Sequence, residues 1–344
     1  MLTSSPWRLR SALIACVVPI AACQAPASSV EAPGPSAAES LAFFVVGDTP
    51  VIDPRHYGAD YLLPGAATAH EDTLHLFPVT FSAEAQEAPR VLHLTSEDGR
   101  TWSGDGSASL LADFEIELNE IGPVPSSVFV ADDGTWVMYG GGRRPGGSDP
   151  VVWRATAPHA DGPWTAHPEP VLVPDVERWD SAVSDHPSVV PADDGYLMAY
   201  GGASIATPNR NRIGVATSGD GLSWARLPAS LEGADDDQAL GPRACGIEAR
   251  SMFEPQLFEI DAGYRLVAGV MLEGELDAME ILAATSADGT NWTCETDDTI
   301  SSTDFPDAPS LHSFAAVENE DEVLILVEVL GDASSTIWLA RAGS

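Results

Sequence analysis

The stretch that decides the fold is Ala216-Thr217-Ser218-Gly219-Asp220-Gly221-Leu222-Ser223-Trp224, because copies of it recur along the chain. Close copies lie at residues 95–102 (TSEDGRTW) and 284–292 (ATSADGTNW), and a degenerate copy lies at 155–164 (ATAPHADGPW). The tryptophans fall at 102, 164, 224 and 292, which gives spacings of 62, 60 and 68 residues. Asp-Gly is a tight-turn signal between two strands, and the tryptophan gives the second strand a large apolar side chain. A turn signature that recurs at such a period indicates radial repetition.

A second apolar hairpin lies upstream of each copy. The segment 125–142 (PSSVFVADDGTWVMYGGG) has a near twin at 187–202, and looser versions lie at 64–79, 255–269 and 312–329. Each unit therefore predicts four antiparallel strands, and five units predict an all-β, five-bladed β-propeller. The fifth unit has no copy of the turn, so we expect the apolar segment 41–47 (LAFFVVG) to add its missing strand and close the ring.

The N-terminal segment has the features of a targeting signal. Arg8 and Arg10 precede the short apolar run 12–20, and Ile20-Ala21-Ala22-Cys23 follows. This ending resembles the lipobox of bacterial lipoproteins, which implies removal of residues 1–22, lipidation of Cys23 and a flexible tether over 23–40. Gln24 after the cysteine is typical of the outer membrane, so we expect a lipid-anchored protein of the bacterial cell envelope. Ordinary secretory cleavage is the alternative.

Charge and cysteine content limit the partners. The chain has 52 acidic and 16 basic residues, and all the basic ones are arginine, so its formal net charge is −36. Such a surface repels nucleic acid and anionic headgroups, and we expect a monomer that meets the membrane only through its lipid. Cys245 and Cys294 remain outside the N-terminal segment and are predicted to form a disulfide in an oxidising compartment; two free thiols are the alternative.

The S-x-D-G-x-x-W phrase and the prolines that open the first strands resemble those of glycoside hydrolase family 43 and its relatives, families 32, 62 and 117. The resemblance covers residues 41–344 and implies a site at one mouth of the central channel. The positions before each proline would border this mouth; they are Leu63, Val124, His186, Glu254 and, before a serine, His312. Glu254 matches the general acid of the family, and Asp185 lies one residue before the position of the aspartate that tunes it. Leu63 occupies the position of the base, so Asp60 is the provisional base.

The remaining predicted site residues would hold ligands. We expect His186, Arg143, Arg212 and Trp179 to bind a glycan, and the resemblance implies that His312 helps to hold a calcium or sodium ion in the channel. Each has a structural alternative: ion pairing for Glu254 and the arginines, structural hydrogen bonding for the histidines, and packing under a loop for Trp179. The sequence thus predicts a glycoside-hydrolase-like lipoprotein that binds and hydrolyses an extracellular glycan. The alternatives are a carbohydrate-binding or scaffold propeller that has lost the base, and a structural propeller that holds a metal.

Overall fold

The structure is a computed structural model, and the compact unit that it describes lies within residues 37–344. It describes residues 42–82, 89–106, 109–111, 123–143, 150–228, 230–231, 239–241, 247–273, 279–295, 299–306, 308, 310–319, 322–331 and 334–343. The predicted signal, Cys23 and the tether lie outside these residues. None of the helices within them is both long enough and apolar enough to span a membrane.

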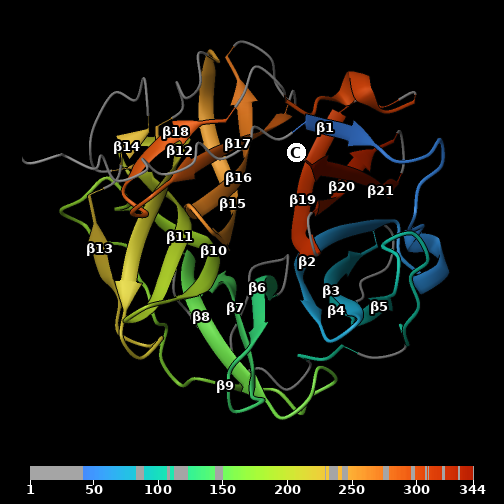
Figure 1. Ribbon diagram of the computed structural model, residues 1–344, viewed down its shortest axis with the longest axis horizontal. Helices are drawn as coiled ribbons and strands as arrows, with labels where there is room; N and C mark the ends of the chain where they lie inside the picture. The colour runs from blue at the N-terminus through green and yellow to red at the C-terminus, as the bar shows by residue number, and fades with distance from the viewer. Residues whose placement is uncertain are drawn as a thin grey trace, which may run out of the picture. The chain divides into compact units, whose positions relative to one another are not determined.

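Five antiparallel sheets form five blades around a central axis, as the repeat predicted (Figure 1). Blade 1 holds β2 (Tyr61–His70), β3 (Thr73–Phe81), β4 (Arg90–Val91) and β5 (Leu94–Ser96). Blade 2 holds β6 (Val124–Val130), β7 (Trp136–Arg143), β8 (Pro150–Ala157) and β9 (Thr165–Ala166). Blade 3 holds β10 (Val183–Ala192), β11 (Gly195–Ser204), β12 (Thr207–Ser218) and β13 (Ala225–Leu227). Blade 4 holds β15 (Ala249–Ile260), β16 (Gly263–Leu272), β17 (Met279–Ser286) and β18 (Asn291–Cys294), with β14 (Ser230–Leu231) added in parallel. Blade 5 holds β19 (Ser310–Asn319), β20 (Glu322–Leu330), β21 (Ser335–Gly343) and β1 (Ala42–Val45).

The ring closes as predicted. Strand β1 pairs antiparallel with β21, so that Ala42 lies opposite Gly343 and Val45 opposite Ala340. The N-terminal strand therefore completes the last blade and covers the edge of β21, which would otherwise be an unpaired edge. Two short 3-10 helices, η1 (Pro54–Tyr57) and η3 (Ser302–Asp304), lie in the connections that lead into blades 1 and 5.

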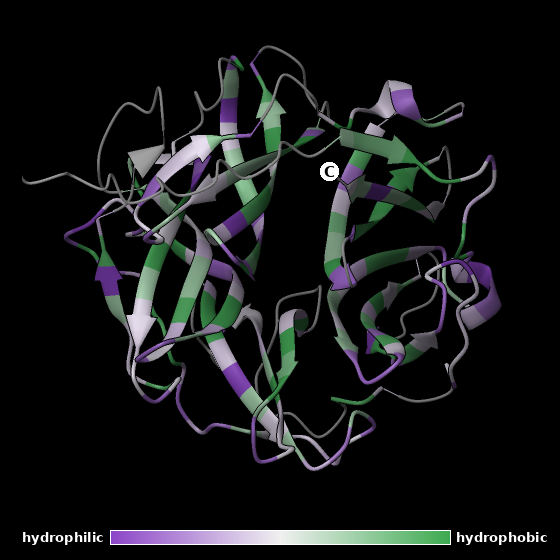
Figure 2. Cartoon of the chain, in the orientation of Figure 1, coloured by the Kyte–Doolittle hydropathy of each residue, from purple (hydrophilic) through white to green (hydrophobic). Residues whose placement is uncertain are grey.

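The hydrophobic core lies between the blades. Five clusters of buried side chains each join two neighbouring blades, and together they follow the ring. Figure 2 shows hydrophobic residues along the strands and hydrophilic residues on many of the connecting turns. Because each blade buries apolar side chains against both neighbours, burial of this surface stabilises the whole ring.

The repeated turn connects the third and fourth strands of a blade and docks on the blade before it. In blade 3 the Ser218 hydroxyl accepts a hydrogen bond from the Gly221 N–H (2.9 Å) and donates one to Asp220 (3.0 Å). The Tyr139 hydroxyl of blade 2 in turn donates a hydrogen bond to the Gly221 carbonyl (2.7 Å). Gly221 has φ +70°, a left-handed value that favours glycine. The phrase therefore sets both the turn and the contact between blades.

Candidate functional site

The innermost strands β2, β6, β10, β15 and β19 each carry a β-bulge near their first residues. The bulges fall between Leu63 and Ala66, Pro125 and Ser127, Asp185 and Ser188, Phe253 and Gln256, and Leu311 and Ser313. A bulge releases a residue from the ladder and re-aims its side chain. Because the five strands follow one another around the axis, the bulges border one end of the channel, and we call this end the mouth (Figure 1).

The sequence analysis expected the residue before the first proline of each blade to border the mouth. This residue is a bulge residue in three blades and a paired strand residue in two. His186, Glu254 and His312 are bulge residues, as expected. Leu63 and Val124 are paired with Val79 and Gly141, so they are ladder residues, which corrects the expectation. The bulge of blade 1 holds Pro64 and Gly65, and that of blade 2 holds Ser126. The difference lies in the position of the proline. It is the first released residue in blade 1 and a paired residue in blade 2, whereas it follows the first released residue in blades 3 and 4.

The structure brings Asp185, His186 and Glu254 together. His186 Nε2 lies 3.9 Å from Glu254 Oε1, and His186 Nδ1 lies 3.6 Å from Asp185 Oδ2. Asp185 Oδ1 accepts a hydrogen bond from the His186 N–H (2.7 Å). Its carboxylate also lies over Gly141 of blade 2, where a Cβ would meet Asp185 Oδ1. His186 of blade 3 thus contacts both Asp185 and the carboxyl group of Glu254 in blade 4.

Glu254 and His186 adopt backbone conformations that their residue types rarely take. Glu254 has φ +51° and His186 has φ +45°, both in the left-handed region. Such a conformation costs about 1–3 kcal/mol for a residue that is not glycine. Strain of this kind at a channel mouth is a reason to look for function in these two side chains.

Burial raises the pKa of Glu254 above its usual range, although the His186 and His312 imidazoles, the Ser313 hydroxyl and the Phe314 N–H oppose the shift. The Phe314 N–H donates to Glu254 Oε2 at 3.3 Å, and the Glu254 side chain is only 15% exposed. For His186, burial lowers the pKa, but Asp185 and Glu254 raise it and prevail. Glu254 is therefore a carboxyl group that keeps its proton to a higher pH than usual, which suits a general acid.

His312 faces the mouth with a carboxylate behind it. Its Nδ1 lies 2.8 Å from Oε2 of Glu328, whose side chain is 1% exposed, whereas the His312 side chain is 56% exposed. A buried carboxylate that binds one ring nitrogen fixes the orientation of the ring. The residues that the structure describes contain no group of three or more His, Cys, Asp or Glu placed to hold a metal.

The structure also describes three other predicted site residues, Asp60, Arg143 and Arg212. Asp60 precedes β2 at the contact between blades 1 and 5, where its carboxylate accepts a hydrogen bond from Ser82 (3.2 Å) and its carbonyl one from the Ser335 N–H (3.0 Å). Arg143 ends β7, and Arg212 lies in β12 opposite Gly202, so both lie toward the mouth end of their blades. The roles of these three residues stay predictions.

Trp179 packs inside the protein, as the structural alternative in the sequence analysis had it. It is 9% exposed and belongs to the core between blades 2 and 3, where its ring stacks on Tyr200 at 5.9 Å between centroids. This burial corrects the expectation that Trp179 stacks on a sugar. The neighbouring residue was missed: Asp180 is fully buried and pairs with Arg226 Nε (2.7 Å) and the Tyr200 hydroxyl (3.1 Å). The available signal for a buried Asp180 was its position next to Trp179, whose large apolar side chain packs in the core.

Cys294 ends β18 and is disulfide-bonded. Cys245, the partner that the sequence suggests, lies outside the described residues, so the Cys245–Cys294 pairing stays a prediction.

No protein-family model matches this sequence, and no curated protein matches it either. Solved structures match the fold. The complex of BT0996 with RGII has a TM-score of 0.61 at 14% identity, over 88% of this chain and 92% of that one. The family 117 glycoside hydrolase Zg3597 of the marine bacterium Zobellia galactanivorans has a TM-score of 0.61 at 15% identity, over 88% and 91%. The family 32 β-fructofuranosidase BmSUC1 of Bombyx mori has a TM-score of 0.59 at 12% identity, over 88% and 62%.

At these identities the likeness concerns the fold. The protein is a five-bladed β-propeller with four-stranded antiparallel blades, and its structural neighbours are glycoside hydrolases of several families.

Proposed function

We propose that this protein binds an extracellular glycan at the mouth and hydrolyses a glycosidic bond there, with Glu254 as the general acid. The observation that carries the proposal is the state of Glu254: a mostly buried carboxyl group with a raised pKa, held on a strained bulge beside His186. Glycoside hydrolysis needs a carboxylic acid that is still protonated at the working pH, so that it can donate a proton to the leaving oxygen.

The neighbours of Glu254 have distinct roles in this proposal. Asp185 and His186 tune the proton affinity of Glu254 through the short chain of contacts described above. Asp60 is the proposed base that activates water; an inverting enzyme needs its two carboxyl groups about 6.5–9.5 Å apart. Arg143 and Arg212 are proposed to bind sugar hydroxyl or carboxylate groups with their guanidinium groups.

One observation favours a second function. The bulge of blade 1 and the residue before it hold Leu63, Pro64 and Gly65, none of which has a carboxylate. A mouth without a base would bind a glycan without cleaving it. The second candidate is therefore a non-catalytic carbohydrate-binding propeller.

The experiment that tests hydrolysis compares two Glu→Gln variants of the same strand, β15. Release of reducing sugar is measured on arabinans, xylans, fructans and galactans, and glycan binding is measured by affinity electrophoresis. Glu254→Gln is expected to lose hydrolysis by a factor of ~10²–10⁴, the usual contribution of a general acid. Glu259→Gln, at the other end of the strand, is expected to keep it.

The outcomes separate the two functions. A wild-type protein that binds a glycan but releases no sugar from any of the panel supports the binding propeller and rejects the enzyme. Hydrolysis that survives Glu254→Gln rejects Glu254 as the acid. Loss of hydrolysis in Asp60→Asn, with binding unchanged, supports Asp60 as the base.

The ion in the channel is also a proposal. We propose His312 as a ligand of this ion because Glu328 binds its Nδ1 and fixes the orientation of the ring at the mouth. Since the described residues offer no group of three metal-ligating side chains, backbone carbonyls and water would complete the shell of a calcium or sodium ion. Elemental analysis of the dialysed protein, with His312→Ala as control, tests this proposal.

We propose that Cys23 carries a lipid that anchors the monomeric propeller to the cell envelope of a bacterium, in its outer membrane, and that Cys245 pairs with Cys294. Metabolic labelling with a clickable fatty acid should mark the wild type and leave Cys23→Ser unmarked. Mass spectrometry of a non-reduced digest should find the peptides of Cys245 and Cys294 joined.

A further inference from the structure

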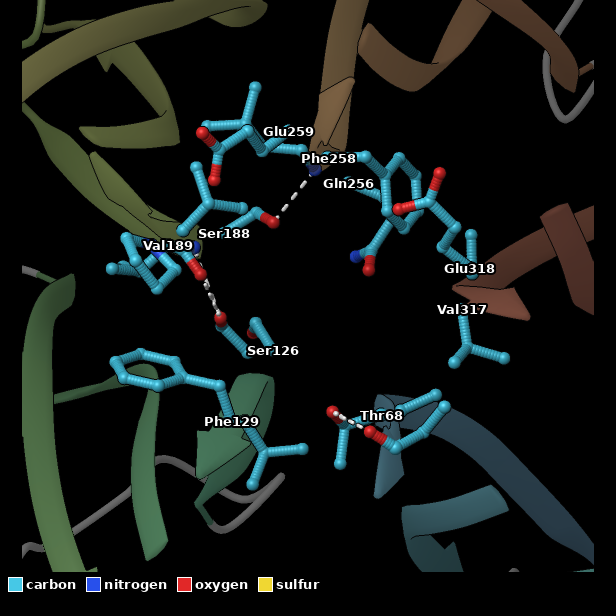
Figure 3. A pocket seen from close by; sticks show the side chains of 18 residues that line it. Thr68, Ser126, Phe129, Ser188, Val189, Gln256, Phe258, Glu259, Val317 and Glu318 are labelled. Carbon is cyan, nitrogen blue, oxygen red and sulfur yellow. Dashed lines mark hydrogen bonds between the residues drawn. The ribbon is translucent and has the colours of Figure 1, made fainter. Parts of the chain in front are cut away.

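A cavity of about 360 Å³ lies in the channel beyond the bulges, on the side away from the mouth. All five innermost strands line it, with residues that follow the bulges and, in blade 2, also with the bulge residue Ser126 itself. We call the end of the channel where these strands finish the distal opening. Figure 3 shows Ser126, Gln256, Glu318 and the rings of Phe129 and Phe258 around this space.

Gln256 breaks a pattern on the wall of the cavity. The residue directly after the bulge is Ser127 in blade 2 and Ser188 in blade 3, and each hydroxyl accepts a hydrogen bond from the next blade. The Val189 N–H donates to Ser127 at 3.0 Å, and the Leu257 N–H donates to Ser188 at 2.8 Å. Gln256 holds the same position in blade 4. Its longer side chain reaches past the wall instead of joining this series.

The Gln256 amide is a buried polar group that points into the cavity. The residue is 7% exposed, and Figure 3 shows its amide directed into the space without a bond to any residue drawn. Among the described residues, none forms a hydrogen bond with this amide. The amide atoms are open to the space of the cavity rather than sealed from it, so a ligand that enters can form a hydrogen bond with them.

Negative charge surrounds the distal opening. Glu259 and Glu318 lie on the rim of the cavity, and both are exposed. The turns that follow the innermost strands of blades 1 to 4 also carry exposed carboxylates: Glu71, Asp72, Asp132, Asp133, Asp193, Asp194 and Asp261. Burial raises the pKa of Glu318, and Arg265, whose guanidinium group binds Glu295 at 3.1 Å, opposes this shift. The field at this opening therefore favours a cation.

The lining favours an organic cation over a metal ion. Phe129, Phe258, Val189 and Val317 give the cavity apolar and aromatic walls, which suit the carbon chain of an organic ligand. A divalent metal ion would need a compact group of oxygen ligands, and the described part of the chain has no group of three His, Cys, Asp or Glu side chains placed to hold a metal. Aromatic faces also attract ammonium groups.

We propose that the distal opening binds a small organic polyamine or other protonated amine, with Gln256 bonding one amine in the cavity and Glu318 pairing with another at the rim. This site is separate from the glycan site of the proposed function, since the two lie at opposite ends of the innermost strands. The propeller would then bind a cationic ligand in addition to a neutral or acidic glycan.

The test is isothermal titration of the full chain with spermidine. It is carried out at 0.15 M salt, where the Debye length is about 8 Å and the diffuse attraction of the net charge is screened. One equivalent is expected to bind. Gln256→Met, which keeps the shape of the side chain, and Glu318→Gln are each expected to weaken binding about tenfold, as for one lost hydrogen bond to a charged group. Glu254→Gln is expected to bind as the wild type does.

Four results would overturn the proposal. Two concern the wild type: no saturable binding of spermidine, or saturable binding of calcium that spermidine does not displace. Two concern the variants: wild-type affinity in both Gln256→Met and Glu318→Gln, or loss of binding in Glu254→Gln. Equal binding would mean diffuse attraction to the acidic surface, and loss in Glu254→Gln would place the amine at the mouth. If Gln256→Met fails to fold, Glu318→Gln decides the question alone, because its side chain is exposed. Hydrolysis is measured separately, so either site can fail without the other.

Discussion

The repeated turns and the bulges of the innermost strands both contain residues in the left-handed conformation, but the residue types differ. Gly99, Gly221 and Gly289 of the turns have φ between +70° and +74°, and they are glycine, which takes this conformation without steric cost. The bulges of blades 3 and 4 place His186 and Glu254 at φ +45° and +51°. The turns use the residue type that takes this conformation at least cost, whereas the bulges of blades 3 and 4 place residues for which it is costly at the mouth.

The difference teaches where stability and function lie in this propeller. Each glycine turn docks on the preceding blade: a Cβ on Gly99 would meet Leu324 and Leu339 of blade 5, and one on Gly289 would meet Leu197 of blade 3. The bulges of blades 3, 4 and 5 instead hold the polar side chains of His186, Glu254 and His312 at the mouth. Substitutions should therefore act with opposite signs in the two regions.

The largest effect is expected for Gly221→Ala. An added Cβ would lie 2.6 Å from the Tyr139 hydroxyl, and alanine is strained at φ +70°. We expect a loss of about 3 kcal/mol in the free energy of unfolding, from backbone strain together with a displaced buried tyrosine. Urea denaturation measures it. Gly219→Ala in the same turn is the matched control, because its Cβ would meet nothing within 4 Å; equal losses in both variants would reject the docking role.

Acid should weaken the degenerate turn of blade 2 more than the others. This turn has Ala157 where the others have serine, and its Asp161 binds His93 Nδ1 (2.6 Å), whose Nε2 meets His75 Nδ1 (2.8 Å). Burial, then His93 and His70, lowers the pKa of His75 to about 4 from 6.5. The unfolded chain therefore takes up the proton first, and this contribution to stability is complete above pH 6.5 and lost as the pH falls toward 4.

The expected loss at His75 is about 2 kcal/mol between pH 7 and pH 4, less than the full shift implies because the ring is partly exposed. His75→Gln should lose correspondingly less stability over that range, as measured by urea denaturation at each pH. His159→Gln, an exposed histidine of the same turn, is the control and should follow the wild type. Identical pH profiles for wild type and His75→Gln would contradict the prediction.

A smaller loss is expected when the serine of a regular turn is removed. In Ser286→Ala the Gly289 and Asp288 N–H groups lose their acceptor, at 2.9 Å and 3.3 Å. We expect a loss of about 1–2 kcal/mol, because a buried N–H is left without a partner. Thermal unfolding measures it, with Ser302→Ala in the short helix η3 as a control. No change in the melting temperature would mean that glycine alone sets the turn.

Much of the fold followed from the sequence because the turn phrase is local. Ser, Asp, Gly and Trp bond within one phrase, as when Trp292 Nε1 donates to the Gly289 carbonyl at 3.0 Å, so seven residues reveal a blade. The closing strand also followed, since 41–47 is apolar and the last blade lacked a strand. That the glycine docks on a different blade was not predictable, because Tyr139 lies 82 residues from Gly221.

The site was harder to predict because register decides it. The bulge of blade 1 is as long as those of blades 3 and 4 but begins at its proline, so Leu63 stays in the ladder, and no local pattern reports where a bulge begins. Glu254, His186 and His312 were found because they are the bulge residues of their blades. Trp179 was misassigned because burial depends on Tyr200, a residue of a neighbouring strand. Gln256 was missed because an amide in an apolar strand has no motif.

The smallest effect, and the one with the opposite sign, is expected for Glu254→Gly. Glycine takes φ +51° without strain, and its introduction also removes a buried carboxyl group whose raised pKa shows that burial opposes its ionisation. We expect a gain of about 1 kcal/mol, since lost hydrogen bonds to Ser313 and Phe314 offset part of the relief. Glu259→Gly, in the same strand at an ordinary φ, should instead lose about 1 kcal/mol, as glycine does within a strand. Urea denaturation at pH 7 of both variants measures the contrast. If Glu254→Gly is no more stable than the wild type while hydrolysis is lost, the bulge is not strained for function, and the distinction between the turns and the mouth fails.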